Sequence, residues 1–180
     1  TVHSGDGRRF TCRLFVEASG RGRSMVGPSR KAFLSDYKNV AIWQHIMGGA
    51  PAQSLPGDWN IFREENLSAI GSFAFPDGWF WYIPVPMEVD GRRVTTHSLG
   101  VVTDPALLSE RGVDLRAPGA LLEQARQVPL LRDLVADARP VYEKTNTATN
   151  YSMISERFCD FDERWILVGD SAHFVDPLFS

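Results

Sequence analysis

The chain ends with the stretch WILVGDSAHFVDPLFS, residues 165–180. The apolar run 165–168 predicts a β-strand, and Gly169, Asp170 and Ser171 then form a sharp polar turn. These residues allow two interpretations. Ser171 could be a nucleophile presented where a strand turns into a helix, or the Asp170 carboxylate could bind hydroxyl groups of a ligand at the strand end.

The nucleophile interpretation needs features that the chain lacks. A G-x-S-x-G elbow requires glycine on both sides of the serine because the turn is too tight for a Cβ, and His173 stands at the second glycine position. A GDS-type esterase needs an acid and a histidine later in the chain, and a triad with His45 or His97 would have an unfamiliar order. Asp170 is the better candidate, although a strand capped by a local Asp170 turn explains the same residues equally well.

Composition excludes several classes of protein. The 180 residues are 43% hydrophobic and 23% charged with a net charge of −3, as in ordinary globular proteins, and no basic block indicates a nucleic-acid partner. The longest apolar stretch, near residues 79–85, is too short to cross a membrane. Cys12 and Cys159 lie far apart and predict reduced thiols in a cytoplasmic protein, and the scattered histidines predict no metal site.

The order of the expected elements indicates an α+β layer rather than repeated βαβ units. A hairpin of two strands joined at Gly5-Asp6-Gly7 is predicted, with residues 10–16 as its second strand, and a glycine turn that lacks the third glycine of a phosphate loop follows. The spacing of apolar residues then predicts strands over 39–47, 59–63, 68–75, 79–85 and 94–102, helices over 118–126 and 129–138, and strands over 141–145, 150–155 and 165–168.

The two ends suggest a piece of a larger fold. The chain begins at Thr1 without a methionine, and it stops at Ser180, where a helix is expected to begin. We therefore expect the chain to be an internal fragment.

The terminal stretch resembles the GD motif of class A flavin enzymes and, among them, of flavin-dependent halogenases. In that family a strand is followed by G-D-A-A, a short apolar loop and D-P-x-F-S. Ser171 replaces an alanine here, and His173 stands at a variable position.

Two further stretches resemble the same family. Residues 78–84, GWFWYIP, are similar to the W-x-W-x-I-P motif of the halogenases, although a buried strand with alternating aromatic residues would read the same way. Residues 14–21, LFVEASGR, resemble a strand that ends in D-A-S-G, with Glu17 in place of aspartate. The motifs occur in the order found in the family.

The resemblance implies an α+β / α/β fold, part of the PHBH-like fold of FAD-dependent monooxygenases. Residues 1–30 would belong to the FAD-binding domain, 31–158 to an antiparallel substrate-domain sheet with two short helices, and 159–180 again to the FAD-binding domain. The GxGxxG loop and the catalytic lysine of the family would lie upstream of Thr1, so the fragment alone would be inactive. No role is assigned to Lys31, Lys38 or Lys144.

The implied chemistry is halogenation of an electron-rich aromatic compound. The family uses reduced FAD (FADH2), oxygen and chloride or bromide to form hypohalous acid, and a separate flavin reductase supplies FADH2. Phe179 stands where halogenases of free tryptophan carry glutamate, which favours phenols or pyrroles, either free or tethered to a carrier protein, as in antibiotic biosynthesis and other secondary metabolism. The alternative is an FAD-dependent monooxygenase without halogenating activity.

The resemblance also implies roles for individual residues. Gly169 and Asp170 would hold the ribityl chain of FAD, Pro177 would line the flavin, and Ser180 would open the turn that binds the halide. A wall that separates the flavin from the substrate would contain four residues of the tryptophan motif: Trp79, Trp81, Ile83 and Pro84.

Overall fold

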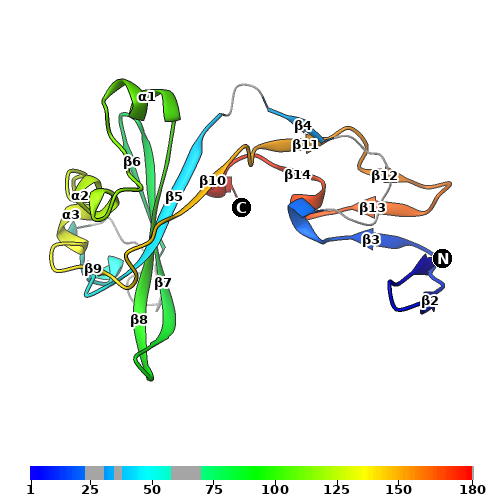
Figure 1. Cartoon of the computed structure of the whole chain (residues 1–180), viewed down its shortest axis with the longest axis horizontal. Coiled ribbons are helices and arrows are strands. Elements are labelled where there is room, and N and C mark those ends of the chain that lie inside the picture. Colours follow the sequence, from blue (N-terminus) through cyan, green and yellow to red (C-terminus); the bar gives the residue numbers. More distant parts are fainter. Residues whose placement is uncertain (23–30, 35–37, 58–69, 180) are drawn as a thin grey trace. The chain divides into compact units, whose positions relative to one another are not determined.

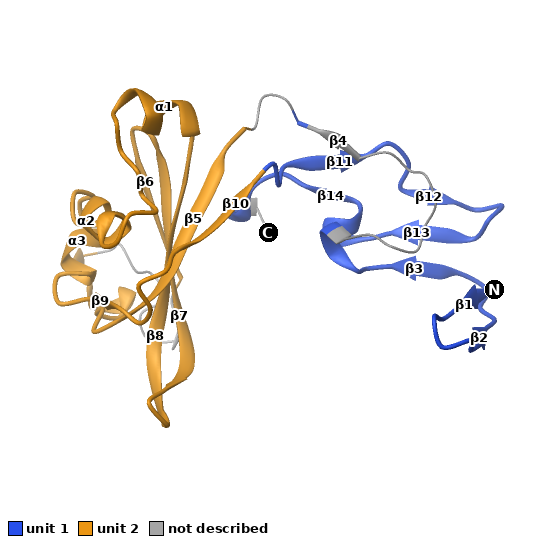
Figure 2. Ribbon diagram, in the orientation of Figure 1, with its two compact units in different colours: residues 1–37, 150–180 blue, residues 38–149 orange. Residues whose placement is uncertain are grey.

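The computed structural model describes residues 1–22, 31–34, 38–57 and 70–179. The chain divides into two compact units, shown in Figure 2: the first contains residues 1–37 and 150–180, and the second contains residues 38–149. The predicted divisions after residues 30 and 158 differ from these limits. Residues 31–34 and 150–158 group with the first unit because the strand at 153–155 pairs with strands of that unit on both sides.

The second unit is built on an antiparallel sheet (Figure 1). Its order is β10-β5-β8-β7-β6, and β9 also pairs with β5. The predicted meander is confirmed in the described residues, whereas the strand expected at 59–63 lies outside them. The strands are β5 (Val40–Met47), β6 (Gly71–Phe75), β7 (Gly78–Val89), β8 (Arg92–Thr103), β9 (Arg139–Pro140) and β10 (Asn146–Thr149).

Short helices pack against one face of this sheet. Helices α2 (Ala120–Ala125) and α3 (Leu131–Leu134) contribute buried leucines to the same core as Phe80 and Tyr82 of β7. Both helices are shorter than predicted, and a 3₁₀ turn, η2 (Ala52–Ser54), adds to this layer.

Helix α1 (Pro105–Glu110) was not predicted. Its start has a clear local signal, because the Asp104 carboxylate accepts a hydrogen bond of 2.8 Å from the Ala106 N–H and Pro105 occupies the first helical position. The strand predicted over 141–145 is wrong. The residues before that segment (β9) and after it (β10) both pair with β5, whereas residues 141–145 form a loop.

In its described residues, the first unit contains short strands in three small sheets. The predicted hairpin is confirmed as β1 (Val2–His3) and β2 (Arg9–Phe10). The strand expected over 10–16 is largely wrong, since the regular part is β3, which is parallel to β13. The remaining elements are η1 (Gly20–Gly22), β3 (Phe15–Glu17), β4 (Lys31–Phe33), β11 (Met153–Ser155), β12 (Cys159–Asp160), β13 (Trp165–Leu167), η4 (Gly169–Ser171), β14 (His173–Phe174) and η5 (Pro177–Phe179).

Candidate functional site

The Gly169-Asp170 turn follows the carboxyl end of β13. Gly169 has φ of 58°, a left-handed conformation that an L side chain adopts only with strain, whereas a Cβ at this position would meet no atom within 4 Å. Glycine is therefore required at this position by the left-handed backbone conformation and not by a lack of space for a side chain. Asp170 is exposed at the turn, so its carboxylate is accessible to a ligand.

The glycine turn at residues 17–20 lies next to it. Strands β3 and β13 are parallel neighbours, and the Val168 N–H donates to the Glu17 carbonyl at 3.1 Å. Glu17 is buried, and its carboxylate accepts a hydrogen bond of 3.0 Å from the Ser19 N–H, which holds the turn that leads to Gly20. Two turns thus meet at the carboxyl ends of parallel strands, where α/β folds commonly bind cofactors.

Ser171 is an internal link between these two strands. Its side chain is fully buried, and its hydroxyl lies 2.6 Å from the carbonyl oxygens of both Glu17 and Val168, which can accept its proton. The Val168 N–H donates to the same hydroxyl at 3.2 Å. A buried hydroxyl with these contacts cannot meet a substrate, so the geometry excludes the nucleophile interpretation.

The segment after the turn is held by a buried carboxylate. Asp176 is 6% exposed and accepts a hydrogen bond of 3.0 Å from the Leu178 N–H, which caps the 3₁₀ turn that starts at Pro177. Ser152 of the adjacent loop donates to the Val175 carbonyl and fixes the same segment. Pro177 is half-buried, and the predicted halide residue, Ser180, lies outside the described residues.

The tryptophan motif occupies the first half of β7. Trp79 and Trp81 lie on the face of the sheet away from the helices, half-buried, with ring centroids 5.9 Å apart. Phe80 and Tyr82 point into the core on the opposite face, as the alternation of a strand requires. Ile83 shares the tryptophan face, whereas Pro84 lies on the core side, opposite His97 in register. The four expected wall residues therefore do not form one surface, because three lie on the tryptophan face and Pro84 lies on the core side.

Trp43 is a third indole on the same face, and sequence reasoning did not assign it to the site. Its ring centroid lies 6.2 Å from that of Trp81. Both side chains flank Gly100, which pairs with Trp43 on β5 and with Trp81 on β7. The alternation of apolar residues in β5 predicts the face on which Trp43 lies. Which residues lie next to Trp43 follows only from the pairing register of β5, β8 and β7.

Tyr82 and His97 form a buried polar pair behind the motif. Their rings stack with centroids 4.2 Å apart, and the Tyr82 hydroxyl donates to the Ala50 carbonyl at 2.8 Å. Burial raises the pKa of Tyr82 and lowers the pKa of His97 to about 4, because each charged form would lose its hydration. His97 is therefore neutral near pH 7.

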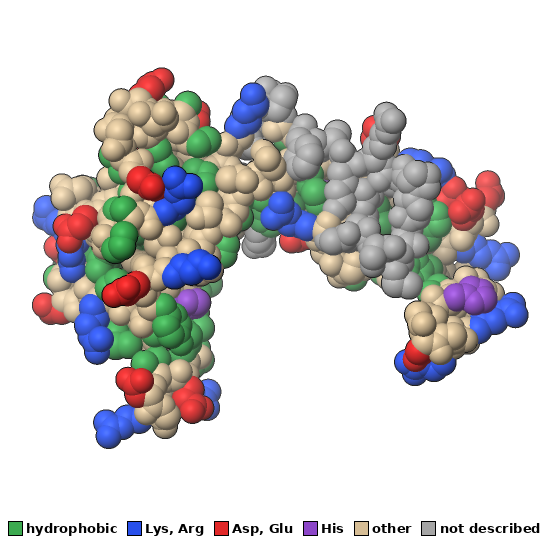
Figure 3. Space-filling model, viewed as in Figure 1, with side chains coloured by type: hydrophobic (Ala, Val, Ile, Leu, Met, Phe, Trp, Pro, Cys, Tyr) green, Lys and Arg blue, Asp and Glu red, His purple; other side chains and the backbone are tan. Residues whose placement is uncertain are grey.

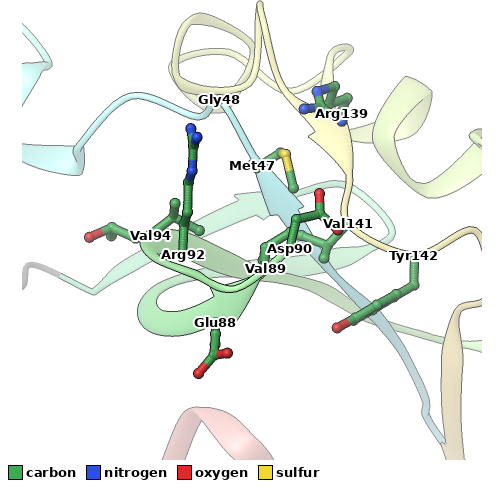
Figure 4. A pocket seen from close by; sticks show the side chains of 11 residues that line it. Met47, Gly48, Glu88, Val89, Asp90, Arg92, Val94, Arg139, Val141 and Tyr142 are labelled. Atoms are coloured by element: carbon green, nitrogen blue, oxygen red, sulfur yellow. The ribbon is translucent and has the colours of Figure 1, made fainter.

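A cavity of about 700 Å³ opens at the far end of the β7–β8 hairpin (Figure 4). Arg92, Arg139, Met47 and Tyr142 are among the residues that line it, with Glu88 and Asp90 contributing opposite charges. None of the residues predicted for the site lines this cavity.

On the face seen in Figure 3, basic and acidic side chains are interspersed over both units. Within the described ranges, no cluster of three or more His, Cys, Asp or Glu side chains could hold a metal ion. No helix in the described part of the chain is long and apolar enough to span a bilayer.

Comparison with known proteins identifies the relatives of the chain. The tryptophan 2-halogenase of Chondromyces crocatus is 28% identical over 179 residues, which cover 98% of this chain and 31% of that protein. The flavin-dependent halogenase armH4 of Armillaria mellea is 25% identical over 191 residues, covering 98% of this chain and 33% of that protein. This chain resembles part of a flavin-dependent halogenase.

The solved structures agree. The myxobacterial chondrochloren halogenase CndH, described as an FAD-dependent halogenase, superposes with a TM-score of 0.66 at 29% identity, covering 98% of this chain and 37% of that one. The PHBH-like fold expected from the sequence is thereby confirmed. The chain spans about a third of the length of the curated halogenases it matches, and no protein-family model matches it.

Proposed function

We propose that the protein containing this chain is a flavin-dependent halogenase. It would use reduced FAD, oxygen and chloride or bromide to halogenate an electron-rich aromatic compound. The observation that carries this proposal is a similarity to named halogenases over 98% of the chain, which includes both the turn at Asp170 and the tryptophan strand.

The first unit fits one part of an FAD site. Asp170 is exposed at the carboxyl end of β13 and can accept charge-assisted hydrogen bonds from the ribityl hydroxyls of the cofactor. Gly169 gives the turn its left-handed conformation, and the half-buried ring of Pro177 offers an apolar surface for the flavin. When bound, reduced FAD would supply the electrons with which oxygen and halide yield hypohalous acid.

The second unit supplies the substrate side. The indoles of Trp79 and Trp81 lie next to each other on the face of the sheet away from the helices, Ile83 shares that face, and Pro84 lies on the core side. Such a surface would separate the aromatic substrate from the flavin and so favour halogenation over direct hydroxylation. The divided roles of the two units are part of this proposal.

Phenols and pyrroles remain the substrates that we propose, on the strength of Phe179 in the D-P-x-F-S stretch. One relative is named as a tryptophan halogenase, so tryptophan must be tested beside phenols and pyrroles. A flavin reductase would deliver FADH2, and the substrate would be a small aromatic molecule, either free or bound to a carrier protein. The two free cysteines, Cys12 and Cys159, are compatible with a cytoplasmic location.

An assay of the full-length protein tests the activity. The protein is incubated with FAD, NADH, a flavin reductase and either chloride or bromide, with phenol, pyrrole and tryptophan as separate acceptors. Mass spectrometry of the products should show the isotope pattern of chlorine or bromine. Hydroxylated products alone would contradict the halogenase assignment, and halogenated tryptophan alone would contradict the substrate class.

The cofactor role of Asp170 has its own test. Asp170→Ala should weaken FAD retention roughly ten- to a hundredfold, because hydrogen bonds to a charged group contribute about 1.5–3 kcal/mol. Bound flavin is measured from its visible absorbance after gel filtration. Asp162→Ala removes another exposed aspartate of the first unit and serves as the control. Equal flavin occupancy in both variants would exclude Asp170 from the FAD site.

A further inference from the structure

Three indole rings form one cluster on the face of the sheet away from helices α2 and α3. The Trp81 centroid lies 6.2 Å from that of Trp43 and 5.9 Å from that of Trp79, with interplanar angles of 44° and 51°. Trp81 is therefore the central ring. Its orientation determines whether the three side chains form a continuous surface.

Gly100 leaves the space in which the central ring lies. An ideal Cβ at Gly100 would be 2.1 Å from Cζ2 and 2.3 Å from Cε2 of Trp81, far closer than real Cβ atoms approach other atoms. Gly100 is not among the residues of positive φ, so alanine could adopt its backbone conformation. The glycine is thus required by the indole that lies across it and not by a turn.

Ser98 fixes the same ring by a directional contact. The Trp81 Nε1–H donates to the Ser98 Oγ at 3.1 Å. Gly100 removes the obstacle beneath the ring, and Ser98 holds its polar edge. A half-buried indole could otherwise adopt several rotamers, and these two residues of β8 favour one of them.

We propose that Gly100 and Ser98 are positioning residues that hold Trp81 flat across β8, between Trp43 and Trp79, and that this three-indole wall sets the ratio of halogenated to hydroxylated product. Trp43 thereby becomes a further member of the wall. The part of this inference that concerns product ratio rests on the proposed function, whereas the part that concerns the orientation of Trp81 does not.

Circular dichroism tests the orientation without any catalytic assay. Neighbouring tilted indoles couple their excited states and give a paired positive and negative band in the far ultraviolet. Gly100→Ala in the full-length protein should reduce this paired band by about half or more, because the central ring must leave its place between two aromatic neighbours. Gly5→Ala is the matched control, since a Cβ there meets no atom within 4 Å and φ is not positive.

A second pair of variants tests the hydrogen bond. Ser98→Ala should weaken the paired band, and Ser98→Thr should restore it because threonine retains the hydroxyl acceptor. Ser72→Ala is the control, since Ser72 is exposed and stands directly opposite Trp81 on β6. If Gly100→Ala fails to fold, this series still decides the question. An unchanged band in Ser98→Ala and in any folded Gly100→Ala protein would overturn the positioning role.

The ratio of halogenated to hydroxylated product tests the part of the proposal that concerns function. In an enzyme that halogenates, Gly100→Ala should lower the ratio of halogenated to hydroxylated product by about tenfold or more, since a displacement of about 1 Å at a reacting site can cost about a hundredfold. Trp43→Phe should cause a smaller fall. If the circular dichroism band changes but the product ratio does not, the proposal that the indole wall sets the product ratio is wrong. A wild-type protein that forms no halogenated product would instead overturn the proposed function, and the spectroscopic result would stand.

Discussion

The turn at Asp170 and the tryptophan strand are built in different ways. The turn belongs to a region of strands only two or three residues long, including β3, β13 and β14. The tryptophan strand belongs to the β7–β8 hairpin, in which each strand has 12 residues. The first region presents an exposed carboxylate, whereas the second presents half-buried rings above a closed core.

Different forces therefore hold the two regions. Near the turn, side chains form hydrogen bonds with the backbone. The Ser171 hydroxyl contacts the carbonyl oxygens of Glu17 and Val168, and the Ser155 hydroxyl donates to the Ser171 carbonyl at 3.1 Å. In the second unit, the sheet and helices enclose fully buried apolar side chains such as Phe80 and Leu99. We expect substitutions in the hairpin to change stability most strongly, and substitutions at the turn to change ligand binding at a smaller cost in stability.

The largest effect on stability is expected for Phe80. Phe80→Ala should lower the free energy of unfolding of the second unit by about 3–5 kcal/mol, because it opens a cavity under the helices. Phe80→Leu keeps most of the volume and should cost less than about 1.5 kcal/mol. Urea unfolding of the full-length protein followed by circular dichroism measures both. A cost for Phe80→Ala no larger than that for Phe80→Leu would contradict a tightly packed core.

His97 gives the second unit a dependence on pH. Its pKa in the folded state is about 4, below its usual value of 6.5, so the unfolded chain binds a proton more readily. The stabilisation is complete above pH 6.5 and is lost as the pH falls towards 4. The loss amounts to at most about 3–4 kcal/mol, from about 1.4 kcal/mol for each pKa unit.

Unfolding measured between pH 4 and 7 would show this slope. His97→Phe keeps the ring stacked on Tyr82 and removes the titrating group, so its stability should change less over the same range. An equal slope in the variant would assign the pH dependence to other groups.

A smaller effect is expected at the turn. Ser171→Ala removes the hydroxyl that links β3 to β13 and should cost about 1–2 kcal/mol, because buried carbonyl oxygens lose a donor. Ser19→Ala, at an exposed position of the neighbouring turn, should change stability by less than about 0.5 kcal/mol. Thermal unfolding of the two variants makes the comparison. A Ser171→Ala protein as stable as Ser19→Ala would show that the backbone pairing alone holds the turn.

Elements with strong local signals were predictable. The Asp-Gly hairpin, the β13 strand with its glycine turn and the alternation of aromatic residues in β7 follow from neighbouring residues, and each is found. The short helix α1 also had such a signal in Asp104-Pro105, which the sequence reasoning did not use. The failure at 141–145 has another cause. Its apolar residues resemble a strand, but tertiary pairing uses the residues on either side.

The sequence by itself determined the motifs, their order and the face on which each aromatic residue of β7 lies, because these depend on local turn chemistry and on the period of a strand. Only the tertiary structure decided which distant residues meet. The parallel pairing of β3 with β13 brings Ser171 to Glu17, and the register of β5, β8 and β7 places Gly100 between Trp43 and Trp81. Pairings between segments so far apart in the chain depend on the packing of the whole fold, which no local pattern encodes.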